Sequence, residues 1–378
     1  MKRTQLFVLA LVPLAAFAQD APEPEAEPAP TAESEGDPDP DRPGWVHGED
    51  EDPLPPNWGQ GLFETSDPYL LNLNRLAPWA RSPEILPHLG IGLALRGSWS
   101  NTYAFANQRY VIDGEVRTVT ASLRLGLFDR IELGINLPYQ WRGGGVMDEF
   151  IDNFHKAFGL PGADRSRVPE DRYGAFGLEV GGNTFNYDHK GYGFSDLILE
   201  GRVQLTQGGS WAPAITAGLL LRLPTGRRKF DLSDGVDVSL TVDMSKRLGA
   251  RSPFVLYMGG ALTYYSHAHL EGLTQLRVRG QFHLGLEWEL NDWISFVVHA
   301  WIESRRQRKL FDDVPDRNPT QPFFDSNLQF GNWISLIAGG FKFEPREGWT
   351  LEVGVIENLI DPETTADFGA LFNASVRW

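Results

Sequence analysis

The chain of 378 residues contains no cysteine, fewer basic than acidic residues, and no long apolar run beyond its N-terminus. The lack of cysteine excludes disulfides, thiolate metal sites and cysteine nucleophiles. No segment after the N-terminus approaches the roughly 18 apolar residues of a membrane-spanning helix, which excludes an α-helical membrane protein. The 34 Lys and Arg residues are outnumbered by 50 Asp and Glu residues, and this balance disfavours nucleic acid as a partner.

Residues 1–18 have the pattern of a secretory signal peptide. Lys2 and Arg3 precede a short apolar core, which ends in the small-x-small sequence Ala16-Phe17-Ala18. The core is too short for a membrane anchor. We therefore expect the protein to be exported and the signal peptide to be cleaved.

Two further segments precede the regular part of the sequence. Residues 19–57 are rich in Pro, Glu, Asp and Ala, and we expect a disordered acidic tail. The formal net charge is −16; the signal peptide carries +2 and residues 20–52 carry −12, so residues 53–378 carry only −6. Residues 58–88 are mixed and interrupted by prolines. They are expected to form either an N-terminal plug inside a barrel or a periplasmic segment.

From residue 89 onward, apolar and polar side chains alternate in segments of about ten residues, which is typical of transmembrane β-barrels. In residues 276–290, for example, Leu284 and Leu286 lie on the face opposite His283 and Glu287. The twelve predicted strands are residues 89–96, 118–127, 131–141, 197–205, 215–223, 236–244, 254–264, 276–290, 294–302, 333–343, 351–359 and 368–378. The expected fold class is all-β: an antiparallel transmembrane barrel of about twelve strands over residues 89–378.

The connections between these strands support a barrel rather than a soluble sandwich. Short joints alternate with longer ones, and the longest are residues 142–194 and 305–329. Outer-membrane barrels show this pattern, with short periplasmic turns and long outer loops. The alternation of faces also predicts three-residue turns at residues 128–130 and 291–293.

The last strand ends on an aromatic residue. Phe368, Phe372, Val376 and Trp378 share one face of this strand, and polar residues occupy the other. The pattern resembles the C-terminal signal by which bacterial outer-membrane barrels are recognised for assembly. An ordinary half-buried edge strand is the alternative. The first interpretation implies location in the bacterial outer membrane, contact with outer-membrane lipid, and the barrel-assembly machinery as a partner.

The longest connection contains a predicted amphipathic helix at residues 146–158. Apolar residues recur there at helical spacing from Met147 onward. This helix either folds into the mouth of the barrel and narrows it or lies at the membrane interface. The residues assigned to the constriction are Trp141, Arg142, Phe150, Phe154, His155, Phe158 and Arg165.

The same loop resembles a known bacterial family. The sequence Trp141-Arg142-Gly143-Gly144-Gly145, the later Phe158-Gly159-Leu160-Pro161 and Arg165 resemble the family catalogued as domain of unknown function 3187. The resemblance extends from about residue 62 to the C-terminus. It implies an outer-membrane barrel and no assigned activity.

A set of polar side chains is predicted to face the lumen: Arg96, Arg124, Arg222, Arg277, Arg279, His283, His299 and Glu287. The two histidines lie diagonally across neighbouring strands, roughly 7–8 Å apart. Zinc would need two more ligands and a closer approach. The sequence thus predicts neither a metal site nor a cofactor.

These features predict a channel or transporter for small solutes in which residues 142–194 constrict the pore. One alternative is a lipid-active outer-membrane enzyme using His155 oriented by Asp152, although no nucleophile motif stands near and catalysis is less favoured. The other is a structural or adhesion barrel with a filled lumen. Fold class does not decide among them.

Overall fold

The computed structural model describes residues 56–73, 75–106, 110–158, 172–180, 183–226, 235–249, 251–267, 269–270, 273–274, 276–304, 334–358 and 366–378. The predicted signal peptide and nearly all of the predicted acidic tail lie outside the described residues. Arg165 does as well.

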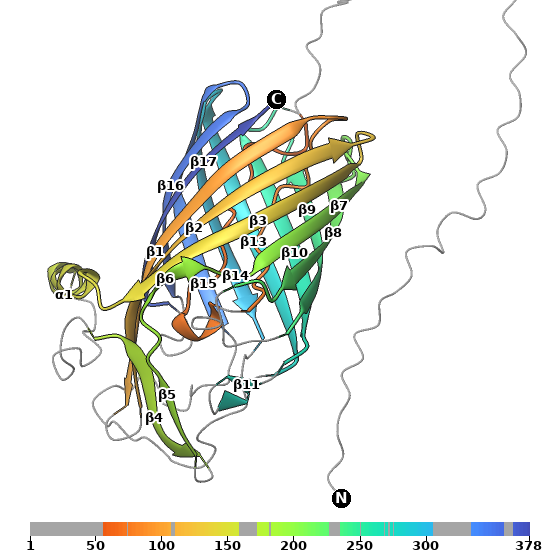
Figure 1. The fold of residues 1–378 in the computed structure, drawn as a ribbon. Coiled ribbons are helices and arrows are strands. Elements are labelled where there is room, and N and C mark those ends of the chain that lie inside the picture. Colours follow the sequence, from red (N-terminus) through yellow and green to blue (C-terminus); the bar gives the residue numbers. More distant parts are fainter. Residues whose placement is uncertain are drawn as a thin grey trace, which may run out of the picture. The chain divides into compact units, whose positions relative to one another are not determined.

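Twelve antiparallel strands close into a barrel (Figure 1). Each strand pairs with the next in the sequence, and β1 pairs with β17 to close the ring. The strands are β1 (Ile91–Ala106), β2 (Tyr110–Leu127), β3 (Ile131–Gly143), β7 (Leu197–Thr206), β8 (Ala214–Leu223), β9 (Asp237–Arg247), β10 (Phe254–Tyr265), β13 (Val278–Asn291), β14 (Ile294–Glu303), β15 (Ile334–Arg346), β16 (Trp349–Asn358) and β17 (Phe368–Arg377). The predicted fold class and strand number are confirmed.

The first hairpin is longer than the alternation predicted. β1 and β2 stay paired from Ile91↔Leu125 to Ala106↔Tyr110, well beyond the predicted strands. In the additional part, outward positions carry polar residues such as Asn101 and Glu115. The loop between β3 and β7 covers these two residues. The outward positions of this part of the hairpin therefore lack the apolar residues from which a strand is predicted.

One of the two predicted turns is confirmed and the other is wrong. Leu127 pairs with Ile131, leaving the expected three-residue turn between them. Asn291 pairs with Ile294, leaving two residues, and the register shifts between Glu289 and Asn291. This bulge adds the unpaired residue that keeps even-numbered side chains of both strands on the outer face.

The barrel is apolar outside and polar inside. On β3 the outward Leu133, Ile135 and Leu137 are exposed, whereas the inward Glu132 and Asn136 are buried. The same alternation continues along β9, β13 and β16. Successive strand side chains point to opposite faces, so this pattern follows directly from the sequence.

Smaller elements occupy the loops. The loop between β3 and β7 contains α1 (Met147–Phe158), β4 (Gly174–Val180), β5 (Asn183–Tyr187) and β6 (Gly191–Phe194). β4 extends the sheet beside β2, and β6 pairs with β3. The loop between β10 and β13 contains β11 (His269–Leu270) and β12 (Leu273–Thr274). Among the described residues, no helix is both long and apolar enough to cross a bilayer.

Residues 56–88, here called the luminal segment, precede β1, and their described part contains one short 3₁₀-helix, η2 (Leu70–Asn72), as its only regular element. Their backbone and side chains bond to inward-facing residues from β7 to β15. Leu62 and Phe63 are fully buried in one apolar cluster with wall residues of β10, β14, β15 and β16. The interior of the barrel is therefore filled in part by the chain's own N-terminal segment.

Candidate functional site in the barrel lumen

The luminal segment begins at the end of the barrel that carries the short turns. Arg247 on β9 donates from Nε to the carbonyl of Pro56 at 3.0 Å and is paired with Glu289 on β13. Ser245 donates to the carbonyl of Asn57 at 2.7 Å. These bonds hold the start of the segment against the rim.

The next residues are held by charged side chains deeper in the lumen. The Glu287 carboxylate accepts hydrogen bonds from the amides of Gln60 at 2.9 Å and Gly61 at 3.0 Å. Lys342 on β15 donates to the carbonyls of Gln60 at 3.0 Å and Leu62 at 2.9 Å. Hydrogen bonds to charged groups stabilise by about 1.5–3 kcal/mol each, so this is a firm attachment.

Glu64 is the centre of an arginine cluster. Its carboxylate accepts hydrogen bonds from Arg81 Nε at 3.2 Å, from Arg96 Nη1 at 2.5 Å, and from Arg124. Burial on its own would raise the pKa of Glu64, but the guanidinium groups of Arg124, Arg81 and Arg96 outweigh it and hold the pKa well below the usual value. Glu64 is therefore ionised, and it ties the segment to β1 and β2.

Arg81 connects the segment to the opposite side of the cluster. Its guanidinium lies 3.0 Å from the carboxylate of Glu132 on β3 and 2.8 Å from that of Glu200 on β7. Three carboxylates thus surround one guanidinium, and the pKa of Arg81 is raised well above its usual value despite burial, which acts in the other direction. The positive and negative charges of the cluster therefore balance one another, and the cluster adds little net charge to the lumen.

The segment reaches toward the long-loop end and then returns. The amide of Leu76 donates to Asp237 on β9 at 3.0 Å, and Asn72 accepts from Arg279 on β13 at 3.0 Å. On the return, Thr216 on β8 donates to the carbonyl of Pro83 at 2.5 Å. The amide of His88 finally donates to Asp129 in a short turn at 2.7 Å. Both ends of the luminal segment consequently lie at the short-turn end.

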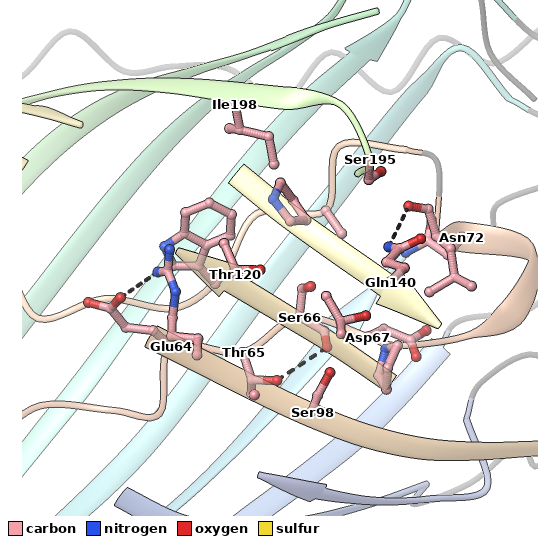
Figure 2. A pocket seen from close by; sticks show the side chains of 18 of the residues that line it. Glu64, Thr65, Ser66, Asp67, Asn72, Ser98, Thr120, Gln140, Ser195 and Ile198 are labelled. Carbon is pink, nitrogen blue, oxygen red and sulfur yellow. Dashed lines mark hydrogen bonds and ion pairs between the residues drawn. The ribbon is translucent and has the colours of Figure 1, made fainter. Parts of the chain in front are cut away.

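Two hollows of about 110 Å³ each remain between the luminal segment and the wall. The first lies toward the long-loop end and is lined by Ser98, Thr120 and Gln140 among others (Figure 2). The second lies toward the short-turn end, where Thr350 and Arg377 line it. Residues lining both are Glu64, Arg96 and Asn373. The Glu64–Arg96 ion pair therefore stands between the two hollows.

Most of the predicted lumen residues face the lumen. Arg96, Arg124, Arg222, Arg279, His283, His299 and Glu287 all project inward, and all but Arg124 are buried. Arg222 pairs with Asp196 and, at 2.8 Å, with Asp237. Arg277 differs because it precedes β13 and is exposed.

The two histidines lie on neighbouring strands, as expected. Gly285, two residues after His283, is the partner of His299, so the histidines are diagonal. His283 Nε2 lies 3.5 Å from Asp243 Oδ1, and His299 packs edge-on against Phe63 and Trp301. The described residues contain no group of three or more His, Asp or Glu side chains that could hold a metal ion.

The predicted constriction is wrong for two of its residues. Trp141 projects outward from β3 and is 43% exposed. Phe150 on α1 is 55% exposed, and its ring centroid lies 6.1 Å from that of Phe368 on the outer face of β17. Glu115 accepts a hydrogen bond from the amide of Met147 at the start of α1. α1 is thus held against the outer face of the extended β1–β2 hairpin, because polar outward residues bind it there.

The remaining constriction and catalytic candidates have different outcomes. Arg142 is buried and donates to Gln140 on the inner face of β3, at 3.2 Å from Nε. The side chains of Asp152, Phe154, His155 and Phe158 lie outside the described residues, as does Arg165. Their predicted roles stay predictions.

The final strand closes the barrel. Trp378 and Ile91 exchange backbone hydrogen bonds of 2.8 and 3.0 Å, and Phe372 is exposed on the outer face. Phe368 pairs with Asn101 and Val376 with Leu93, so both also face outward. The recognition of these residues during assembly stays a prediction.

The cluster around Glu64 and Arg81 was missed from the sequence. Neither residue stands in a periodic segment, and the charged groups that contact their side chains lie up to 119 positions away. The one available signal was the presence of five charged residues, Glu64, Asp67, Arg75, Arg81 and Glu84, in a largely apolar and Pro-rich stretch that precedes a barrel with many inward charges.

The family model described as "Protein of unknown function (DUF3187)" matches residues 53–307. Among solved structures, an outer-membrane channel from Pseudomonas putida F1 is similar over 79% of this chain and 98% of its own, with 13% identity and a TM-score of 0.48. The NanC porin is similar over 75% and 98%, with 9% identity and a TM-score of 0.40. The toluene transporter TodX of Pseudomonas putida is similar over 76% and 88%, with 9% identity and a TM-score of 0.34. No curated protein matches the chain.

Proposed function

The chain belongs to the DUF3187 family of proteins of unknown function, and we propose that it is a bacterial outer-membrane channel for small solutes in which the luminal segment acts as a plug. The structural feature that most directly supports this proposal is the pair of hollows on either side of the Glu64–Arg96 contact.

The outer surface supports a membrane location. Its exposed apolar side chains include Leu93, Leu123, Ile135, Val203, Leu240, Leu262, Leu284, Phe341, Val353 and Phe372. A soluble protein rarely exposes so large an apolar surface, and only helices and closed barrels satisfy their backbone groups within lipid. Export through residues 1–18, assembly through the last strand, and contact with outer-membrane lipid are parts of the same proposal.

The path runs along the inner wall of β1, β2 and β17. Ser98 and Thr120 line it on the long-loop side of the Glu64–Arg96 pair, and Ala94 and Ser375 line it on the other side. These four side chains are small, and Arg96 and Asn373 lie between them, whereas elsewhere in the lumen the plug contacts the wall directly. A modest displacement around Glu64 would join the hollows into one passage.

Single-channel conductance in a planar bilayer tests this function. Mature protein should give discrete current steps, and Glu64→Gln should increase conductance because it removes the charge that holds three arginines across the path. Glu303→Gln is the matched control, since Glu303 is a buried lumen carboxylate that lines neither hollow. Folded protein without current in both the parent and Glu64→Gln forms would refute the channel.

A structural barrel with a filled lumen is the second candidate. The many bonds between the luminal segment and the wall, such as those of Lys342 and Arg247, favour it. A structural barrel predicts no current and no change with Glu64→Gln. The conductance measurement therefore decides between the two candidates.

A further inference from the structure

The hollow at the long-loop end is lined by hydroxyl groups that are not engaged. Ser98 on β1 and Thr118 and Thr120 on β2 line it and are only partly buried, and their hydroxyl groups make no hydrogen bond within the described residues. Ser98 and Thr118 are direct partners across the two strands, and Figure 2 shows Ser98 and Thr120 among the side chains that line the hollow. Each hydroxyl can donate one hydrogen bond and accept two. One wall of the hollow is therefore a row of free donors and acceptors.

Two buried N–H groups on the opposite side also lack partners. Asn72 is 2% exposed, and its Nδ2 finds no acceptor among the described residues. Trp79 Nε1 is likewise buried without an acceptor in the described part of the chain. Both residues line the hollow. A buried donor without an acceptor costs about 1–3 kcal/mol, so a solute whose acceptors reach either N–H group gains that energy.

Each charged group around the hollow lies near a group of opposite charge or a hydrogen-bond donor, including Arg75, which lies 3.9 Å from Asp237. Arg96 is paired with Glu64, Arg222 with Asp196, and Asp67 accepts a hydrogen bond from the amide of Tyr69 at 3.0 Å. The lining charges also balance, with Arg75, Arg96 and Arg222 against Glu64, Asp67 and Asp196. An ionic solute would have to break one of these pairs and leave a buried charge, which is costly.

We propose that this hollow is a binding site for a small uncharged polyhydroxyl solute, such as a monosaccharide or a sugar alcohol. Hydroxyl groups both donate and accept, so they satisfy the wall hydroxyls and the two orphan N–H groups together. The volume of the hollow also fits a solute of this size. One water molecule needs about 10–15 Å³ of cavity volume, so the hollow of about 110 Å³ accepts a molecule on the order of ten non-hydrogen atoms. The assignment rests on the proposed channel, because the site lies on its path.

Equilibrium dialysis with the full-length protein in detergent tests the proposal. The probes are radiolabelled glucose, gluconate and glucosamine, which have similar size and are neutral, anionic and cationic. Glucose should bind, and the two charged probes should bind at least tenfold more weakly. The double variant Ser98→Ala/Thr120→Val should weaken glucose binding roughly tenfold through the loss of two hydrogen bonds.

Ser295→Ala is the matched control, because Ser295 is another inward hydroxyl without a partner among the described residues and lies outside the hollow. It should bind glucose like the parent. Equal binding of a charged probe, no binding of glucose, or no effect of the double variant would each overturn the site. Glucose binding without current in a bilayer would instead keep the site and refute the channel, so the two failures are distinguishable.

Discussion

The Glu64 carboxylate and the Arg96 guanidinium meet at 2.5 Å between two hollows of the lumen. One residue belongs to the luminal segment and the other to the first barrel strand. The contact is thus both an attachment of the plug to the wall and the barrier between the two hollows. Changes that weaken it should loosen the plug and open the path together.

Acid should remove this attachment. The pKa of Glu64 is lowered in the folded protein by Arg124, Arg81 and Arg96 against the effect of burial. A lowered pKa means that Glu64 adds stability above its unfolded pKa, about 4.3, and that this stability is lost as the pH falls through the folded value. At pH 7, Glu64→Gln should lower the free energy of unfolding by about 3 kcal/mol.

The pH dependence of unfolding in lipid vesicles checks this expectation. The difference between the parent and Glu64→Gln should shrink progressively below pH 4, as the carboxyl becomes protonated. A constant difference from pH 7 down to pH 2 would show that the effect of the variant does not come from the charge.

A disulfide between the luminal segment and the wall should close the channel. The chain contains no cysteine, so Pro83→Cys with Thr216→Cys introduces a single pair at a place where the two residues already share a hydrogen bond. If conduction requires the segment to move, oxidation should abolish the current and a reductant should restore it. The two single-cysteine variants are the controls, and they should conduct under both conditions. Unchanged current in the fully oxidised double variant would show that the segment does not move.

A charge on the outer face should destabilise the barrel in lipid. Leu284 lies near the middle of β13 and is 46% exposed on the outer face. Leu284→Arg should cost about 2–4 kcal/mol in vesicles, because the guanidinium would enter the hydrocarbon region. Trp211→Arg is the control, since Trp211 lies in a short turn and is 94% exposed. Equal stability of both variants would argue that the outer face of β13 does not contact the hydrocarbon region of the bilayer.

The barrel could be predicted because alternation of faces is a local property of the chain. Leu284, Leu286 and Glu287 take opposite sides of β13 whatever lies around them. The turn at residues 291–293 failed because a bulge at Leu290 satisfies the same parity with one residue fewer in the turn. The alternation of faces fixes whether the number of unpaired residues between the two strands is odd or even. It does not fix whether the additional residue lies in the turn or in a bulge of the strand.

The course of the luminal segment and the position of α1 could not be predicted for a different reason. The luminal segment has no periodicity of its own, and its course follows from bonds such as that of the Gln60 amide to Glu287, 227 positions later. The helical spacing predicted α1 well, at residues 146–158 against Met147–Phe158. Its site depends on Glu115, which lies on the outer face of the part of β2 that extends beyond the predicted strand.

The luminal segment enters and leaves the barrel through the same opening and does not pass from one end of the barrel to the other. Pro56 is held at the rim by Arg247, and His88 is held in a neighbouring turn by Asp129, so both ends sit at the same opening. A loop of this kind can be withdrawn through the opening by which it entered, without any chain end passing through the ring of strands. Withdrawal of the segment, as the proposed channel requires, would therefore leave the topology of the chain unchanged.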